Sequence, residues 1–287
     1  MGTLSRNRID AILELLSDDA RDVRQLVIDE LRSMPPRDLE ALKEAAHRAP
    51  DHIAMVIDNA ILRHRWHGLE SQLTHLRQAG SPDLETLMIH LAEFGHLECD
   101  GAAVSTELAS LSGRCQAAFR KSSTLVGKSE AIANVLGNEL AFRGNQDDYY
   151  DPENSFIDSV LERRLGIPIS LSALYIIIGE KLGVPLKGIG LPCHFVVGLF
   201  RRGQVPCFFD PFRRGMRLSE LDCIRLIEQC GYNFDAKYLN PVSAFHMLMR
   251  SMSNLLCIYK DRDDRPRHRA VYRMLQVIRE ASPSVEC

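Results

Sequence analysis

The sequence predicts an α+β protein in which a buried central helix packs on a small antiparallel sheet, with helical extensions at both ends. Three observations support this prediction. Residues 169–182 are apolar on nearly every side, as expected of a helix surrounded by other elements. Three strand-like runs follow at 186–189, 194–200 and 204–210, separated by turn residues. Amphipathic helical patterns occupy most of the remaining chain, which is typical of segregated helices and strands.

Composition narrows the class of protein. The chain has 287 residues, of which 45% are hydrophobic and 25% charged, an ordinary globular composition. That length is enough for one large domain or two modest ones with a sizeable core. The formal net charge of -3 and the pI of about 6.4 argue against the basic field of a nucleic-acid-binding protein.

The sequence also predicts a cellular location. The first ten residues are polar and do not resemble a signal peptide, and no apolar run approaches the length of a membrane span. Eight cysteines are scattered without a C-x-x-C pair or zinc spacing. We therefore expect a soluble cytoplasmic protein with reduced thiols.

The first 80 residues are predicted to form a helical subdomain. Apolar positions recur at helical spacing over 9–16 and 23–31, with an Asp-rich turn at 17–19 between them. This helix, turn and helix is similar to one HEAT-type unit, although a solenoid needs about three such units. We expect residues 1–80 to be a HEAT-like subdomain joined to the rest of the chain by a linker at 79–82.

The remaining chain is predicted to divide into a core at 81–235 and a helical hairpin at 236–287. In the hairpin, helices at 243–259 and 266–281 would pack antiparallel around a charged turn, an arrangement similar to a tetratricopeptide unit. Apart from the central helix, the helices expected in the core lie at about 84–94, 103–119, 129–140, 156–161 and 219–229.

His194 and Asp210 are the best candidates for a functional site. His194 begins one apolar strand and Asp210 ends another, so the carboxylate of one strand would orient the imidazole of its neighbour. A nucleophile at the start of a packed helix would complete a catalytic triad, because the helix dipole lowers the pKa of a thiol there. The other histidines lie mostly among charged helix residues without completing ligands, so we expect no metal and no other cofactor.

Several segments of the chain form a combined pattern. They are Tyr149–Pro152, Asn154–Phe156, Gly166–Ser172, Leu191–Phe195, Asp210–Phe212 and Met249–Leu255. Together they resemble the transglutaminase-like superfamily and, within it, the SirB-type family of bacteria that is also found in some F-box proteins. The resemblance covers roughly residues 83–281 and leaves the N-terminal 80 residues outside. It departs from the family at Cys193, where a glycine is usual.

The resemblance implies a papain-like core in which a cysteine begins the central helix and a strand histidine and an Asp-Pro pair follow. Here the family pattern puts Pro168 at the position of the nucleophile. His194 and Asp210 would then be a remnant dyad, and the chain would be a pseudoenzyme.

Three other side chains are candidates for the missing nucleophile, and the sequence disfavours each of them. If Cys193 lies on a strand beside the histidine, the two side chains point to opposite faces, which makes Cys193 a buried or edge thiol. Ser170 lies about 200° around the helix from Pro168 and therefore faces away. Ser172 shares the face of Pro168 one turn deeper, where we expect its hydroxyl to bond to a backbone carbonyl.

Two hypotheses about function follow. The first is a non-catalytic scaffold or regulatory module that binds another protein, and neither nucleic acid nor a membrane. Under this hypothesis, His194 and Asp210 persist because the loss of either residue would leave the other buried without a hydrogen-bond partner, at a cost of about 1–3 kcal/mol. Asn154 would cap a helix. The alternative is a hydrolase or acyl transferase in which Cys193 or a serine acts with His194 and Asp210, and Asn154 donates to an oxyanion.

Overall fold

The computed structural model describes residues 4–78, 80, 82–119, 122–201 and 207–279. The chain forms two compact units, of which the first holds residues 1–72 with 96–98 and the second 73–95 with 99–287. The division falls inside helix α4 (Asp51–Gln78), before the predicted boundary at residue 80. Residues 79 and 81 of the predicted linker lie outside the described residues.

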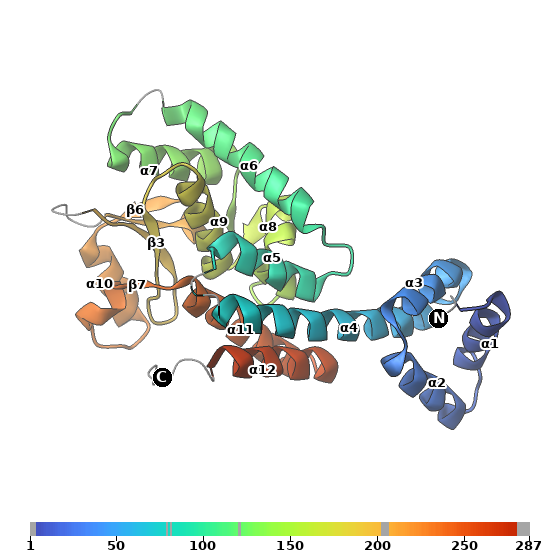
Figure 1. Ribbon diagram of the computed structural model, residues 1–287. Helices are drawn as coiled ribbons and strands as arrows, with labels where there is room; N and C mark the ends of the chain where they lie inside the picture. The colour runs from blue at the N-terminus through green and yellow to red at the C-terminus, as the bar shows by residue number, and fades with distance from the viewer. Residues whose placement is uncertain (1–3, 79, 81, 120–121, 202–206, 280–287) are drawn as a thin grey trace. The chain divides into compact units, whose positions relative to one another are not determined.

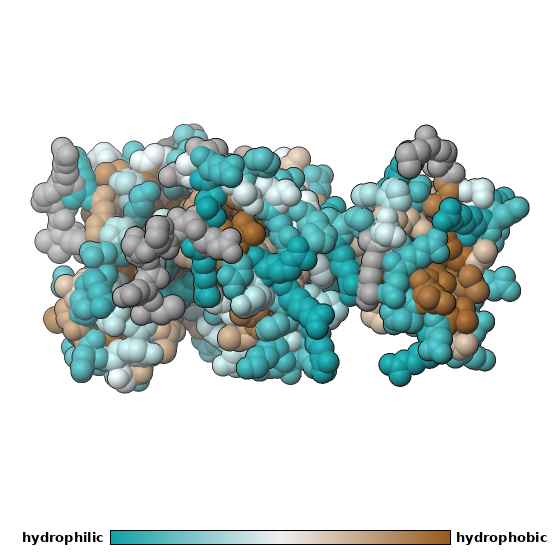
Figure 2. Space-filling view, turned by 60° about the horizontal axis from the view of Figure 1, so that its bottom comes forward, coloured by the Kyte–Doolittle hydropathy of each residue, from teal (hydrophilic) through white to brown (hydrophobic). Residues whose placement is uncertain are grey.

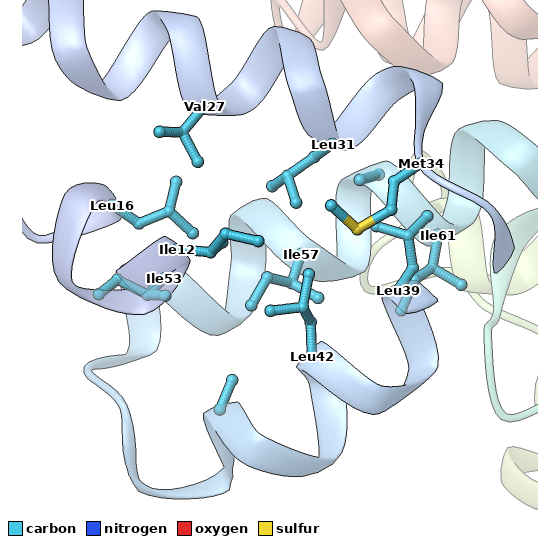
Figure 3. Close-up of a cluster of buried hydrophobic side chains, with 12 residues drawn as sticks. Ile12, Leu16, Val27, Leu31, Met34, Leu39, Leu42, Ile53, Ile57 and Ile61 are labelled. Carbon is cyan, nitrogen blue, oxygen red and sulfur yellow. The ribbon is translucent and has the colours of Figure 1, made fainter. Parts of the chain in front are cut away.

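Helices build the N-terminal unit. They are α1 (Arg6–Leu16), α2 (Arg21–Ser33), α3 (Pro36–Ala45), the 3-10 turn η1 (Ala46–Arg48) and the first part of α4. Proline occupies the first turn of α3, where its missing N–H costs nothing. Figure 3 shows apolar side chains from all four α-helices meeting in one cluster that includes Ile12, Leu31, Leu42 and Ile57. The apolar positions of the sequence pattern therefore form the core of this unit.

Part of the apolar surface of the N-terminal unit remains exposed. Leu26 and Met55 are more than half exposed, and Leu15 is also accessible. Figure 2 shows hydrophobic residues gathered at the surface of this unit among polar ones. Exposed apolar residues of this kind are common on globular proteins and assign no function by themselves.

Helix α9 (Pro168–Lys181) is the centre of the second unit, and the prediction of a buried central helix is confirmed. Every residue from Pro168 to Gly179 is buried, because neighbouring elements cover the helix on all sides. It contacts the sheet strands β3 (Leu186–Ile189) and β4 (Val196–Leu199) as well as the helices α5 (Leu84–Gly95) and α6 (Gly101–Ala118) (Figure 1).

The main sheet is antiparallel and has the order β6-β5-β4-β3-β7. Its strands are β3 (Leu186–Ile189), β4 (Val196–Leu199), β5 (Cys207–Asp210), β6 (Met216–Leu218) and β7 (Pro241–Val242). The three predicted strands are present, and two short edge strands complete the sheet. Leu186 packs against Gly179 of α9, whereas Ile189 belongs to a cluster with residues of α10 (Glu220–Gln229). Alternation along each strand thus buries both faces of the sheet.

The second predicted strand was placed too early. β4 begins at Val196, and residues 191–194 form a tight turn in which the His194 amide donates to the Leu191 carbonyl at 3.2 Å. Cys193 adopts a left-handed conformation with φ of 59°, which cannot continue a strand. His194 therefore lies in the turn that precedes β4. Residues 202–206, which include the start of the third predicted strand, lie outside the described residues.

Short elements connect the helical layer to the sheet. α7 (Leu125–Asn134) continues into the π-helical turn η3 (Val135–Glu139), and β1 (Arg143–Gly144) pairs in parallel with β2 (Leu165–Gly166). Between these two strands lie the 3-10 turn η4 (Pro152–Ser155) and α8 (Ile157–Arg163).

The chain continues into an antiparallel pair of helices, α11 (Ala244–Asp261) and α12 (Arg265–Arg279), which lie side by side in Figure 1. α11 also packs against α5 and α9, so the pair belongs to the same compact unit as the sheet. Residues 280 and 281 of the second predicted helix lie outside the described residues. No helix in the described part of the chain is both long and apolar enough to cross a membrane.

Candidate functional site

The turn that carries His194 is held by Arg250 of α11. The Arg250 guanidinium donates to the carbonyls of Leu191 at 2.8 Å and His194 at 2.9 Å, and it lies 5.5 Å from the centroid of the Phe195 ring. These contacts join residues more than fifty positions apart and fix the backbone from which the imidazole projects. The sequence pattern includes Arg250 in the segment 249–255 but does not indicate this positioning role.

Asp210 ends β5 and is fully buried. Its Oδ2 lies 3.0 Å from His194 Nε2, within hydrogen-bonding distance. Its Oδ1 accepts hydrogen bonds from the backbone amides of Phe212 at 3.1 Å and Arg213 at 3.3 Å, which caps the 3-10 turn η5 (Pro211–Arg213). The carboxylate therefore orients the imidazole and stabilises the turn at the same time.

The imidazole of His194 is held on one side and open on another. Its side chain is 14% exposed, and its ring meets the Phe212 ring edge-on at a centroid distance of 6.2 Å. Among the described residues, no side chain forms a hydrogen bond with Nδ1. Nδ1 is thus the nitrogen that a reacting group or a bound partner would meet.

Pro168 is buried and occupies the first position of α9, where its side chain provides no nucleophile. Ser170 is committed to the backbone, because its hydroxyl donates to the Asn154 carbonyl at 2.6 Å and accepts from the Ile167 amide at 3.1 Å. The prediction that the Ser172 hydroxyl bonds to a backbone carbonyl is wrong, since this buried hydroxyl has no hydrogen-bond partner among the described residues. None of these side chains forms a nucleophile–base pair with the histidine.

The prediction that Cys193 is a buried or edge thiol on a strand is wrong. Cys193 has a left-handed backbone conformation, and its side chain is exposed. Among the described residues, no hydrogen bond links its thiol to His194.

Asn154 does not cap a helix, as the sequence suggested. Its Oδ1 accepts from the Asn145 side chain at 3.0 Å, and its Nδ2 donates to the carbonyls of Asp148 at 2.7 Å and Tyr149 at 3.2 Å. α8 begins instead after Phe156 without a side-chain cap. Because its amide is used within the loop, Asn154 positions residues 145–149 and is not free to bind an oxyanion.

A cavity of about 390 Å³ lies next to Phe212, between β1, β2 and η5. Its lining residues are Arg143, Gly144, Asn145, Gln146, Asp147, Leu165, Phe212, Arg213 and Arg214. Three of them are arginines and only one is acidic. In the described part of the chain, Arg143 and Arg214 have no ion-pair partner, whereas Arg213 approaches Asp210 at 3.7 Å. The cavity is therefore positively charged, a feature that the sequence pattern did not indicate.

Aromatic side chains border this cavity. The Tyr149 ring meets the rings of Phe212 at 6.1 Å and Tyr150 at 5.3 Å, and Tyr150 is 69% exposed. Burial raises the pKa of Tyr149, and burial lowers the pKa of Arg250. Within the described residues, no group of three His, Cys, Asp or Glu side chains is arranged to hold a metal ion.

Comparisons with known proteins match the region that contains this site. The family model described as the transglutaminase-like superfamily matches residues 102–253. A UPF0162 protein of Xylella fastidiosa is 36% identical over 145 residues, which are 47% of this chain and 50% of that protein. A UPF0162 protein of Vibrio cholerae is 37% identical over 120 residues, 42% of this chain and 41% of that protein.

A eukaryotic protein is similar over the same extent. F-box only protein 21 of Homo sapiens is 35% identical over 138 residues, which are 46% of this chain and 22% of that protein. The chain thus spans about half the length of the bacterial relatives named above and a smaller share of the F-box protein. No solved structure matches the chain.

Proposed function

Because the chain belongs to the transglutaminase-like superfamily, we propose that it is a non-catalytic member that binds another protein through the face around the His194–Asp210 pair. A closer kinship with the SirB-type family and a cytoplasmic location are part of this proposal. The matched segment is only 22% of F-box only protein 21, so a domain of this kind occurs as one part of a larger protein, which supports a modular role.

The start of α9 is the observation that carries the non-catalytic half of the proposal. Covalent acyl transfer needs a nucleophile within about 2.6–3.2 Å of its base, or a geometry that can reach it. Pro168 stands at the helix start, and the nearby Ser170 hydroxyl is bonded to backbone groups. The His194–Asp210 pair, in contrast, has a structural use, because the Asp210 carboxylate caps η5.

The cavity beside Phe212 supports the binding half. Arginine and exposed tyrosine are enriched at protein interfaces, where they serve as anchors. Arg143 and Arg214 bring positive charge that no carboxylate of the described structure neutralises by an ion pair, and Tyr150 lies exposed next to this region. The complementary partner is an acidic segment of a protein, with carboxylates for the arginines and an apolar side chain for the tyrosines.

Catalysis is tested with the wild-type protein and the His194→Ala variant. We expect both to leave a chromogenic ester and a glutamine-containing peptide unchanged above the buffer background, because a missing nucleophile costs several orders of magnitude in rate. Product release is followed by absorbance and by ammonia detection. Turnover by the wild type that disappears in His194→Ala, and also in Cys193→Ser, would favour the cysteine hydrolase instead.

Binding is tested with a fluorescent peptide rich in Asp and Glu that contains one Leu and one Tyr. The double variant Arg143→Gln/Arg214→Gln should bind it about tenfold more weakly, since two exposed charge pairs of about 0.7 kcal/mol each amount to about 1.4 kcal/mol. Fluorescence anisotropy gives Kd, and raising the salt concentration should reduce the difference between the proteins.

The matched control removes the same charge elsewhere. Arg225 and Arg269 are exposed and lie outside the cavity lining, so Arg225→Gln/Arg269→Gln should change Kd less than twofold. Equal losses in the two double variants, or equal binding of a peptide in which Gln and Asn replace Glu and Asp, would mean that the cavity is not an acidic-peptide site.

A further inference from the structure

The arginine-lined cavity has walls whose backbones are fixed by pairing and close packing. On one side β1 pairs in parallel with β2, and the amide of Arg143 donates to the carbonyl of Arg164 at 3.0 Å. Gly144 of β1 approaches η5 so closely that a Cβ there would lie 2.3 Å from the Phe212 ring. The lining side chains therefore project from a rigid frame, which lowers the entropy cost of binding a ligand.

Arg214, on another wall of the cavity, has a backbone conformation that arginine rarely adopts. Its φ of 56° is left-handed, and the next residue, Gly215, has φ of 74°. The amide of Gly215 donates to the carbonyl of Asp210 at 2.8 Å and closes the turn between β5 and β6. Glycine and asparagine adopt the left-handed conformation more easily than arginine. The arginine is therefore a costly choice for this turn, and strained residues of this kind gather at functional sites.

The charge of the lining fits a phosphate better than a carboxylate. Three guanidinium groups and one carboxylate, that of Asp147, leave a net charge of +2. Arg213 comes no closer than 3.7 Å to Asp210, and the other two arginines have no ion-pair partner within the described residues. A carboxylate carries one negative charge and fits one guanidinium bidentately. A phosphate monoester carries a charge of about −1.5 to −2 at pH 7 and three acceptor oxygens, enough for several guanidinium groups.

We infer that the cavity binds a phosphorylated serine or threonine in the acidic segment of the partner. The inference rests on the proposed function, from which it takes the protein segment, and it adds the group that the arginines recognise. Arg143 and Arg214 would contact the phosphate from different walls, and Leu165 and Phe212 give apolar surface for the carbon atoms of the phosphorylated residue. Arginine clusters recognise phosphorylated motifs in this way in several kinds of protein domain.

The test compares three fluorescent peptides that differ at one position. Each is the Asp- and Glu-rich peptide described above, with phosphoserine, glutamate or serine at its centre. The full-length protein should bind the phosphoserine peptide about tenfold more tightly than the glutamate peptide, because the phosphate brings a second negative charge and a third oxygen to the arginines. Fluorescence anisotropy at one fixed salt concentration gives each Kd.

The pH dependence separates a phosphate from a carboxylate. The second pKa of a phosphate is about 6, so the preference for phosphoserine should fall from about tenfold at about pH 7.5 to about threefold at about pH 5.5. The pKa of glutamate is about 4.3, so the glutamate peptide should keep its Kd over this range. Protonation of Asp147 or His194 makes the surroundings of the cavity more positive and would tighten binding, so it cannot cause this loss.

Two asparagine variants test the role of Arg214. Arg214→Asn removes the charge but suits the left-handed turn, so it should unfold at a temperature no lower than the wild type. Its preference for phosphoserine over glutamate should fall from about tenfold to less than about threefold. Arg164 is the matched control, because it is also left-handed, with φ of 58°, and exposed, but lies outside the cavity lining. Arg164→Asn should keep the full preference.

The outcomes distinguish this inference from the proposed function. Equal Kd values for the phosphoserine and glutamate peptides, both raised in Arg143→Gln/Arg214→Gln, would overturn the inference and leave the proposed function intact. Failure of all three peptides to bind would reject both. Complete competition by inorganic phosphate or adenosine monophosphate near the Kd of the phosphopeptide would make a small phosphate compound the ligand. Equal loss of the preference in Arg164→Asn and Arg214→Asn would place phosphate recognition outside the cavity, and either result would overturn the inference.

Discussion

Replacement of Asp210 with alanine should lower the free energy of unfolding by about 3 kcal/mol, one of the two largest effects expected in this protein. The buried carboxylate accepts hydrogen bonds from the backbone amides of Phe212 and Arg213 and contacts the His194 imidazole. Hydrogen bonds to a charged group contribute about 1.5–3 kcal/mol, and the stranded donors would add a desolvation cost. Urea unfolding followed by circular dichroism gives the difference by linear extrapolation.

Two further variants separate the contribution of this site from a general effect of losing an acidic cap. Asp210→Asn keeps one oxygen for the two amides and should cost only about 1 kcal/mol. Asp235 caps a comparable 3-10 turn, η6 (Ala236–Leu239), but is exposed, so Asp235→Ala should cost about 0.5–1 kcal/mol. If Asp210→Ala costs no more than Asp235→Ala, the buried pair does not stabilise the fold.

The second large effect is expected at Gly137, in the π-helical turn η3. A Cβ at this position would lie 2.0 Å from the carbonyl oxygen of Arg214. That oxygen belongs to the backbone and can give way only if a whole segment moves. Gly137→Ala should therefore destabilise the protein by about 3 kcal/mol, at the upper end of the usual cost of overpacking. The midpoint of urea unfolding measures this loss.

A second glycine provides the matched control. Gly113 lies inside α6, and a Cβ there would have no neighbour within 4 Å. Gly113→Ala should raise the free energy of unfolding by about 0.5–1 kcal/mol, because alanine loses less backbone entropy in a helix. Because Arg214 lines the cavity, Gly137→Ala should also weaken binding of the acidic peptide. If Gly137→Ala leaves the free energy of unfolding unchanged, the turn at Arg214 moves freely.

Much of the architecture could be predicted from the sequence because it is encoded in short stretches. An apolar run without a polar face can only be a buried helix, and α9 is buried over its first twelve residues, Pro168–Gly179. Strand β3 has the predicted bounds, since turn residues flank it on both sides. The placement of His194 and Asp210 near neighbouring strands also follows from local signals, and their side chains lie 3.0 Å apart.

The tertiary structure alone decided the features that depend on contacts between distant segments. Edge strands of two or three residues, β6 and β7, are too short to leave a periodic pattern, and the left-handed turn at Cys193 overrides the apolar run that follows it. The hydrogen bonds of Arg250 to the turn that carries His194, and the grouping of arginines around the cavity, join segments that meet only in the folded chain. Periodicity reports which face of an element is buried, whereas the partner of a polar side chain is chosen by packing across the whole unit.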